Sequence, residues 1–201
     1  DVSYRYYPHD FRKKDLYQLN VWTGYSVKHA SKIVAVSQKT KDDIVAQYGL
    51  PADSITVIHN GFEPPPVLVP QGKDKTLIYI GTLQPRKNVE TLLEAYALFR
   101  RTHADYRLVI VGKKGWLYEH IADAVERYHL RDAVTFTGYV DEQEKYRLLG
   151  HARALLLPAY YEGFGLQLLE AMWTGTPIIA ARTGSLPEIG GEACLYTDPL
   201  D

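Results

Sequence analysis

Two adjacent cations follow an apolar run near the middle of the chain. The run ends at Ile80, and residues 81–88 read Gly-Thr-Leu-Gln-Pro-Arg-Lys-Asn, which places Arg86 and Lys87 just ahead of a segment with helical spacing. The N–H groups and dipole of a helix N-terminus favour an anion, a guanidinium can bind two of its oxygens, and an ammonium adds a point charge. The arrangement suits a diphosphate, although an Arg-Lys pair in a loop is more commonly a solvated surface. It is not a P-loop, because the Gly-Lys-Ser/Thr ending is absent.

Two glutamates lie in and shortly after a second loop. Residues 160–165 read Tyr-Tyr-Glu-Gly-Phe-Gly and lead into a helical segment from Leu166, so Glu162 lies in the loop and Glu170 on the second helical turn. The glycines allow close backbone approach to a ligand, and the Glu170 side chain is expected to lean toward the helix N-terminus. Both carboxylates are therefore predicted to face one ligand and to accept hydrogen bonds from sugar hydroxyls. The alternative is a capping acid and an unrelated, solvated helix acid.

A third loop, residues 137–140, reads Thr-Gly-Tyr-Val and follows a strand-forming run that ends at Phe136. Its backbone could hydrogen-bond the edge of a nucleotide base, and Tyr139 could flank the ring. Taken by itself, the segment is more simply a turn.

Short apolar runs that alternate with helical segments must position these loops. Most of the runs are continuously apolar, as expected of parallel strands covered on both faces. The predicted strands are Lys32–Val36, Ile55–Ile58, Thr76–Ile80, Arg107–Val111, Ala133–Phe136, Ala154–Leu157, Pro177–Ala180 and Ala193–Tyr196. Alternation of strand and helix predicts an α/β fold with a Rossmann-like, doubly wound, mainly parallel sheet. In such sheets ligands bind beyond the carboxyl ends of the strands, where all three loops lie.

Helix starts are indicated by capping residues. Asn88 precedes apolar residues spaced i, i+3, i+4 and i+7 from Val89 and is the expected N-cap of that helix. Asp141 followed by Glu144 has the spacing of a capping box that opens a short helix.

One boundary stands out in the first third of the chain. Residues 60–66 read Asn-Gly-Phe-Glu-Pro-Pro-Pro, and three prolines in a row can continue neither helix nor strand, so they predict a stiff linker. Residues 62–201 then form one domain. Residues 1–61 supply too few elements to bury a core of their own and are expected to pack on that domain or to belong to a larger one. The chain begins at Asp1 without a methionine, which suggests a fragment.

The bulk composition excludes several classes of protein. The formal net charge of −1 provides no positive field for nucleic acid. One cysteine, Cys194, cannot form an internal disulfide, and no Cys/His pattern suggests zinc. No apolar run approaches the ~20 residues that span a bilayer. A reducing, cytoplasmic location is expected, with peripheral attachment to a membrane left open for the full-length protein.

Several short motifs occur in a fixed order. They are residues 81–88, Val111-Gly112, residues 137–140, Glu162-x7-Glu170, Gly175-Thr176-Pro177 and Ser185-Leu186-Pro187-Glu188. In this order and spacing they resemble the family-4 retaining glycosyltransferases of the GT-B fold, and the resemblance covers essentially the whole chain. Residues 31–61 resemble the end of the acceptor-binding domain and its crossing into the donor-binding domain.

The resemblance implies transfer of a hexosyl group, of mannose or glucose type, from a UDP- or GDP-sugar with retention at the anomeric carbon. Arg86 and Lys87 would neutralise the donor diphosphate, Glu162 would contact the transferred sugar, and Glu170 would accept hydrogen bonds from the ribose. No Asp-x-Asp motif occurs, so no metal or other cofactor is expected. Further donor-binding residues implied are Gly81, Thr82, Gly138, Tyr139, Val140, Phe164, Gly165 and Leu166.

One departure from the family pattern affects the expected activity. The family carries a catalytic-region His, and Asp1-Val2-Ser3 resembles the residues that follow it. The chain is therefore expected to bind donor but to transfer poorly to a carbohydrate or lipid-linked acceptor. The alternatives are a nucleotide-sugar-binding module without catalysis and a sugar-nucleotide epimerase on a related fold. A dehydrogenase is disfavoured because no Gly-x-Gly-x-x-Gly follows a strand.

Overall fold

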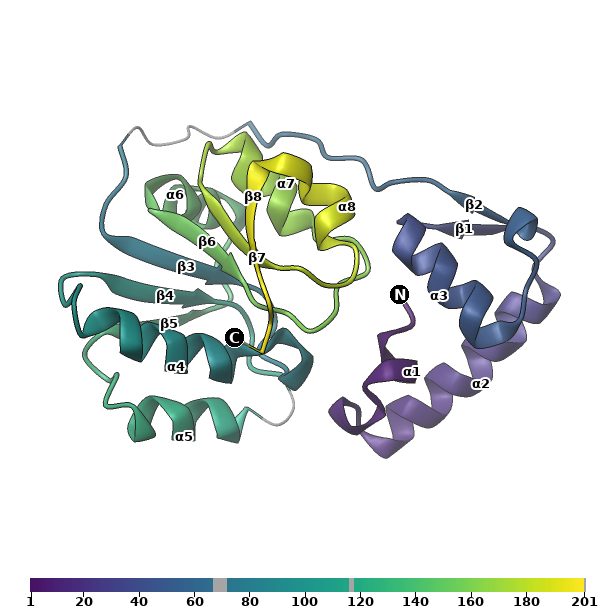
Figure 1. Ribbon diagram of the computed structural model, residues 1–201, viewed down its shortest axis with the longest axis horizontal. Coiled ribbons are helices and arrows are strands. Elements are labelled where there is room, and N and C mark those ends of the chain that lie inside the picture. Colours follow the sequence, from purple (N-terminus) through teal and green to yellow (C-terminus); the bar gives the residue numbers. More distant parts are fainter. Residues whose placement is uncertain (67–71, 116–117, 201) are drawn as a thin grey trace.

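The structure, a computed structural model, describes residues 1–66, 72–115 and 118–200. It contains two units, one formed by the first sixty or so residues and one by the rest (Figure 1). Between them, the described part of the predicted linker, residues 60–66, forms neither helix nor strand.

The larger unit is built on a six-stranded sheet with the order β5-β4-β3-β6-β7-β8, and every neighbouring pair is parallel. Its strands are β3 (Thr76–Ile80), β4 (Arg107–Val111), β5 (Val134–Gly138), β6 (Ala154–Leu157), β7 (Ile178–Ala181) and β8 (Cys194–Thr197). The predicted doubly wound α/β sheet is confirmed, and all eight predicted strands occur with ends that shift by no more than two residues. The largest shift is in β5, which continues to Gly138 because the register with β4 changes after Ile110.

Helices cover both faces of this sheet (Figure 1). Helices α4 (Val89–Arg100) and α5 (Glu119–Arg127) pack on one face, around fully buried residues such as Leu93 and Leu108. Helices α6 (Glu142–His151), α7 (Leu166–Trp173) and α8 (Leu186–Gly190) pack on the other. The two faces arise because right-handed crossovers lead the chain outward from β3 to β5 and then, in the opposite direction, from β6 to β8.

The smaller unit has only two parallel strands, β1 (Ile33–Ala35) and β2 (Ile55–Val57). Around them lie α1 (Ser3–Tyr6), η1 (Pro8–Asp10), α2 (Lys13–His29), α3 (Gln38–Tyr48) and η2 (Ala52–Ser54). They enclose a small apolar cluster that includes Val2, Tyr4 and Ile44. Within the described residues, none of the helices combines the length and apolarity that a bilayer crossing requires.

The two predicted helix starts turned out differently. The Asp141 carboxylate accepts a hydrogen bond from the Glu144 amide at 2.8 Å and caps α6 as predicted, but the Glu144 carboxylate binds Arg147 instead of closing the box. Asn88 occupies the N-cap position of α4 as predicted, but its side chain forms no hydrogen bond that caps the helix. Its backbone is left-handed, with φ of 56°. Its side-chain amide donates to the carbonyl oxygens of Pro158 and Pro199. Asn88 therefore ties the start of α4 to the ends of β6 and β8.

This role of Asn88 can be tested by two substitutions. Asn88→Ala removes both hydrogen bonds and places a residue poorly suited to left-handed backbone there, so we expect the free energy of unfolding to fall by about 2–3 kcal/mol. Asn88→Gly removes the same bonds without the backbone penalty and should cost about 1 kcal/mol less. Urea denaturation measures both values, and equal losses would contradict the strained backbone.

Candidate functional site

The candidate site lies between β3 and β6, where the order in which the chain adds strands to the sheet reverses. Strands β3 and β6 are neighbours, with Leu77 beside Ala154 and Ile78 beside Leu155, although 73 residues lie between the end of β3 and the start of β6. The loops that follow them therefore meet at one edge. In open α/β sheets this crevice is the usual ligand site, because the flanking crossovers diverge there and leave space between the loops.

Arg86, Lys87 and Glu162 form one cluster in this crevice. The Lys87 ammonium forms a hydrogen-bonded ion pair with the Glu162 carboxylate, and a guanidinium nitrogen of Arg86 lies 3.6 Å from the other carboxylate oxygen. The side chains of Lys87 and Glu162 are each 10% exposed and that of Arg86 is 16% exposed. These three side chains carry a formal charge of +1, and the Asp10 carboxylate of the smaller unit also interacts electrostatically with Arg86. Two cations this close together and this little exposed favour an anionic ligand.

Burial sets the electrostatics of the cluster. It lowers the pKa of the Lys87 ammonium, the attraction of Glu162 opposes that shift, and the nearby Arg86 cation adds to it. Burial also raises the pKa of the Tyr79 phenol, with a further contribution from Glu162. An incoming anion would restore a full set of counter-charges to Lys87 and Arg86, so binding and charge stabilisation are coupled here.

The backbone of the second loop is held by the same arginine. Arg86 donates from its guanidinium to the Tyr161 carbonyl at 2.9 Å, and its own carbonyl accepts from the Tyr160 amide at 2.9 Å. On the other side, the amide and hydroxyl of Ser185 both donate to the Glu162 carbonyl at 3.0 Å. The side chain of Glu162 thus starts from a backbone fixed on two sides.

The smaller unit also contacts this loop. Ser37 and Thr40, at the start of α3, donate from their hydroxyls to the Gly163 carbonyl at 2.8 and 3.2 Å. Asp43, one helical turn later, accepts from the Tyr161 hydroxyl at 2.6 Å. Asp1 lies against Gly163 as well, because a Cβ built on that glycine would be 2.5 Å from the Cβ of Asp1.

These contacts were missed by sequence reasoning. Ser37 has the ordinary signature of an N-cap, and its side chain does accept from the Thr40 amide at 3.0 Å. Nothing in the local pattern indicates that the same hydroxyl also reaches a carbonyl 126 positions away. The only signal was the expectation that residues 1–61 pack on the larger unit.

Glu170 belongs to a second ion pair. Its carboxylate accepts from the Lys145 ammonium at 2.6 Å, and the two side chains are 15% and 22% exposed. Lys145 lies on α6 and was not among the predicted residues. Each of the two glutamates is therefore paired with its own lysine in this structure, Glu162 with Lys87 and Glu170 with Lys145.

The remaining residues predicted near the sugar and phosphates lie at the same edge. Phe164 and Gly165 are buried just before α7, and Gly165 takes a left-handed φ of 90° at its N-cap position. Leu166 is 43% exposed at the first position of the helix. Gly81 and Thr82 follow β3 directly, and the Thr82 carbonyl accepts from the Tyr79 hydroxyl at 3.4 Å.

The third loop lies two strands away from β3, at the end of β5. The Gly138 carbonyl accepts from the Gly112 amide at 2.9 Å, and Val140 packs on the core beside α6 to α8. Tyr139 is 73% exposed and has the Lys113 ammonium 4.7 Å from its ring centre. The described contacts place this tyrosine with the loop after β4 and do not join it to the Arg86 cluster.

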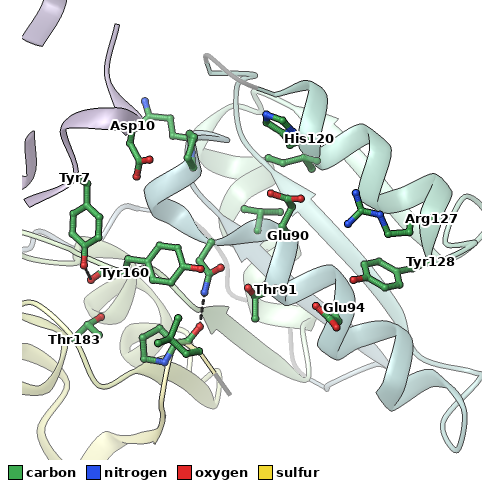
Figure 2. Close-up of a pocket in the computed structure, with 17 residues that line it drawn as sticks. Tyr7, Asp10, Glu90, Thr91, Glu94, His120, Arg127, Tyr128, Tyr160 and Thr183 are labelled. Carbon is green, nitrogen blue, oxygen red and sulfur yellow. Dashed lines mark hydrogen bonds between the residues drawn. The ribbon is translucent and has the colours of Figure 1, made fainter. Parts of the chain in front are cut away.

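A cavity of about 680 Å³ lies next to the cluster, between the start of α4, α5 and the smaller unit. Figure 2 shows Tyr7 and Asp10 on one side of it and Glu90, Glu94 and His120 on the other. The lining residues do not include Arg86, Lys87 or Glu162. Because three carboxyl groups line it, this cavity is a poorer place for a diphosphate than the Arg86 cluster. Across the described residues there is no grouping of His, Cys, Asp and Glu suited to a metal ion.

Two family descriptions match the chain. The family described as glycosyl transferases group 1 matches residues 63–193, and the one described as glycosyltransferase family 4 matches residues 2–64.

Curated relatives and solved structures are similar over nearly the whole chain. The O-antigen chain mannosyltransferase B of Escherichia coli is 33% identical, over 98% of this chain and 54% of the relative. The glycogen synthase of Mycobacterium tuberculosis is 31% identical, over 92% of this chain and 46% of the relative. The structure of HepE from Anabaena in complex with UDP and glucose is similar with a TM-score of 0.73 and 21% identity, over 96% of this chain and 55% of that one. The chain thus spans about half the length of the curated relatives it matches.

The close packing behind Glu162 leads to a prediction about Gly184. This glycine has φ of 56°, and an added Cβ would lie 2.6 Å from the Glu162 carbonyl oxygen and 2.7 Å from its nitrogen. Gly175 has φ of 62° but open space around an added Cβ, so Gly175→Ala reports the backbone strain alone, about 1–2 kcal/mol. Gly184→Ala should lower the free energy of unfolding by about 1–2 kcal/mol more, because it also displaces the Glu162 backbone. If both variants lose the same free energy of unfolding in chemical denaturation, the loop at Glu162 moves aside without a measurable cost, which contradicts the prediction.

Proposed function

The chain belongs to the glycosyl transferases group 1 family, and from that we propose that residues 62–201 bind a nucleotide sugar whose hexosyl group the whole protein transfers to an acceptor. The observation that carries the proposal is the buried cluster of Arg86, Lys87 and Glu162, with its surplus of positive charge at the switch point of the sheet. A diphosphate linked to a sugar matches this cluster in both charge and chemistry, because the sugar hydroxyls can donate to the carboxylate.

In this proposal the two cations act on the leaving group. As the bond between the anomeric carbon and the diphosphate oxygen breaks, negative charge develops on the nucleoside diphosphate. Arg86 and Lys87 already occupy their positions, so they stabilise that charge without reorganisation, an effect of about 2–4 kcal/mol for each such contact. Glu162 orients the hexosyl group beside them. Transfer proceeds with retention and needs no divalent metal, because the side-chain cations take its role.

The other predicted residues bind the rest of the donor. The Glu170 carboxylate accepts hydrogen bonds from the ribose, the amides of Phe164, Gly165 and Leu166 approach sugar or phosphate, and Gly81 and Thr82 line the phosphate side. Residues 138–140 contact the base. Lys145 holds Glu170 in the structure at 2.6 Å, so this lysine lies within reach of the ribose or the phosphates.

The donor is a UDP- or GDP-linked hexose. The mannosyltransferase of Escherichia coli among the relatives supports a mannosyl group, and the UDP and glucose in the HepE complex support including UDP and glucose in any test. The acceptor is a carbohydrate or a lipid-linked saccharide.

Residues 1–61 are proposed to be the end of an acceptor-binding domain. The outer face of α2 supports this, because Tyr17, Trp22 and Tyr25 are 70%, 65% and 64% exposed there. Several exposed aromatic side chains on one helix are typical of a contact surface. The greater length of the relatives agrees with a larger domain around these elements.

Loss of Lys87 tests the phosphate assignment. We expect Lys87→Ala to weaken binding of UDP or GDP about 30- to 100-fold in titration calorimetry, as one charge-assisted contact is removed. Lys75→Ala is the matched control, because Lys75 pairs with Asp105 on an exposed surface before β3. Unchanged affinity in a folded Lys87→Ala protein would refute the assignment.

Glu162 and Glu170 are expected to contact different parts of the donor. Glu162→Gln is expected to weaken the nucleotide sugar about tenfold while leaving the nucleoside diphosphate unchanged or tighter, because a negative charge beside the phosphates is removed. Glu170→Gln should weaken both ligands by the same factor, since both contain the ribose. Calorimetry with each ligand pair measures this, and the reverse pattern would exchange the two roles.

A further inference from the structure

Glu188, on α8 of the larger unit, accepts three hydrogen bonds from the smaller unit. Its carboxylate accepts hydrogen bonds from the Gln38 amide at 2.7 Å, the Lys39 amide at 3.1 Å and the His59 ring at 2.8 Å. Burial tends to raise the pKa of Glu188, but these three donors outweigh it, and the pKa lies below its usual value. The carboxylate is thus held as an anion by donors that all come from the smaller unit.

Two of these donors are the first amides of an eleven-residue helix, α3. The first turn of α3 reads Gln-Lys-Thr-Lys and contains no acidic side chain of its own. A carboxylate at this end complements the helix dipole and satisfies amides that have no partner within the helix. Glu188 of the larger unit therefore provides a negative charge at the N-terminus of α3 in the smaller unit.

Contacts from α3 and from the turn before Glu188 hold the second loop, residues 160–165, from two sides. On one side, Ser37 and Thr40 of α3 donate to the Gly163 carbonyl. On the other, Ser185, three residues before Glu188, donates to the Glu162 carbonyl. Two successive peptide carbonyls of the loop are thus held from opposite units, and Glu188 joins the two sides.

His59 adds a contact near the end of the same loop. It precedes the linker between the units, and its ring centre lies 5.9 Å from that of Phe164. Glu188 binds its Nε2 atom and so orients the ring beside Phe164. The carboxylate thereby contacts the start of α3 and His59, two parts of the smaller unit that border residues 163–164.

We propose that Glu188 is a positioning residue which, by holding the start of α3 and His59 against the loop, fixes Glu162 for contact with the donor sugar. The inference rests on the proposed function, because it assigns Glu162 to the sugar. Glu188 itself binds no part of the donor. Arg86 and Lys87 lie after β3 and are not among the hydrogen-bond partners of Glu188, so we expect affinity for the diphosphate to change less than affinity for the sugar.

The distinguishing readout is the sugar increment, defined as the dissociation constant of a nucleoside diphosphate divided by that of its sugar conjugate. It is measured by calorimetry on the 201-residue chain with UDP and UDP-glucose and with GDP and GDP-mannose. Glu188→Ala should lower the increment about five- to tenfold, while affinity for the nucleoside diphosphate changes by less than about threefold. Glu188→Gln keeps an acceptor but loses the charge, so its loss should be intermediate.

Controls separate positioning from stability. Glu192→Gln makes the same chemical change on an exposed carboxylate four residues further along and should leave the increment unchanged. Hydrogen exchange at the Gln38 and Lys39 amides should accelerate in Glu188→Ala, which reports release of α3. If Glu188→Ala fails to fold, Glu188→Gln decides by the same ratio.

The possible outcomes are distinct. Faster exchange with an unchanged sugar increment would overturn the positioning role and leave the proposed function intact. An increment of one in the unsubstituted chain would overturn the assignment of Glu162 to the sugar and, with it, this inference. No binding of any of the four ligands would overturn the proposed function as well. A fall in the increment for Glu188→Ala but not for Glu192→Gln supports the proposal.

Discussion

A buried carboxylate shared between two cations is the interaction on which the site depends. Lys87 and Arg86 supply counter-charges to a Glu162 carboxylate that is only 10% exposed, and Glu162 in turn offsets the repulsion between two adjacent, little-exposed cations. The cluster is satisfied by itself but carries a surplus positive charge. This combination keeps the three side chains ordered in the absence of ligand and still favours an anion, which is the requirement for a preorganised phosphate site.

The cluster brings together two loops that are far apart in the chain, and the sheet topology makes this possible. β3 and β6 lie side by side only because the chain first builds one half of the sheet outward and then returns to build the other. Arg86 reinforces the meeting of the loops, because its carbonyl accepts from the Tyr160 amide and its guanidinium donates to the Tyr161 carbonyl. A single residue thus serves as cation and as structural clamp, so substitution of Arg86 would affect both functions at once.

The second loop is also a contact surface between the units. Its carbonyls at positions 160 and 163 accept from Tyr7 and from Ser37 and Thr40 of the smaller unit, and those at 161 and 162 accept from the larger one. Any rearrangement of the units would release half of these bonds. The geometry of Glu162 is therefore coupled to how the units are packed, which gives the smaller unit an influence on the proposed donor site in addition to any role in acceptor binding.

Much of this protein could be predicted from its sequence, because parallel strands buried on both faces are continuous apolar runs and because glycines, caps and charges mark the loops at their ends. The eight strands, the doubly wound sheet and the meeting of Arg86, Lys87 and Glu162 at one edge follow from such local patterns, and the role of these residues in donor binding stays a prediction. Local patterns could not show that Lys145 pairs with Glu170, that Asn88 ties three segments together instead of capping its helix, or that Glu188 receives its donors from residues 38, 39 and 59. Each of these is a hydrogen bond between segments separated by at least 25 positions, and its partners are determined only when the chain has closed into a particular packing.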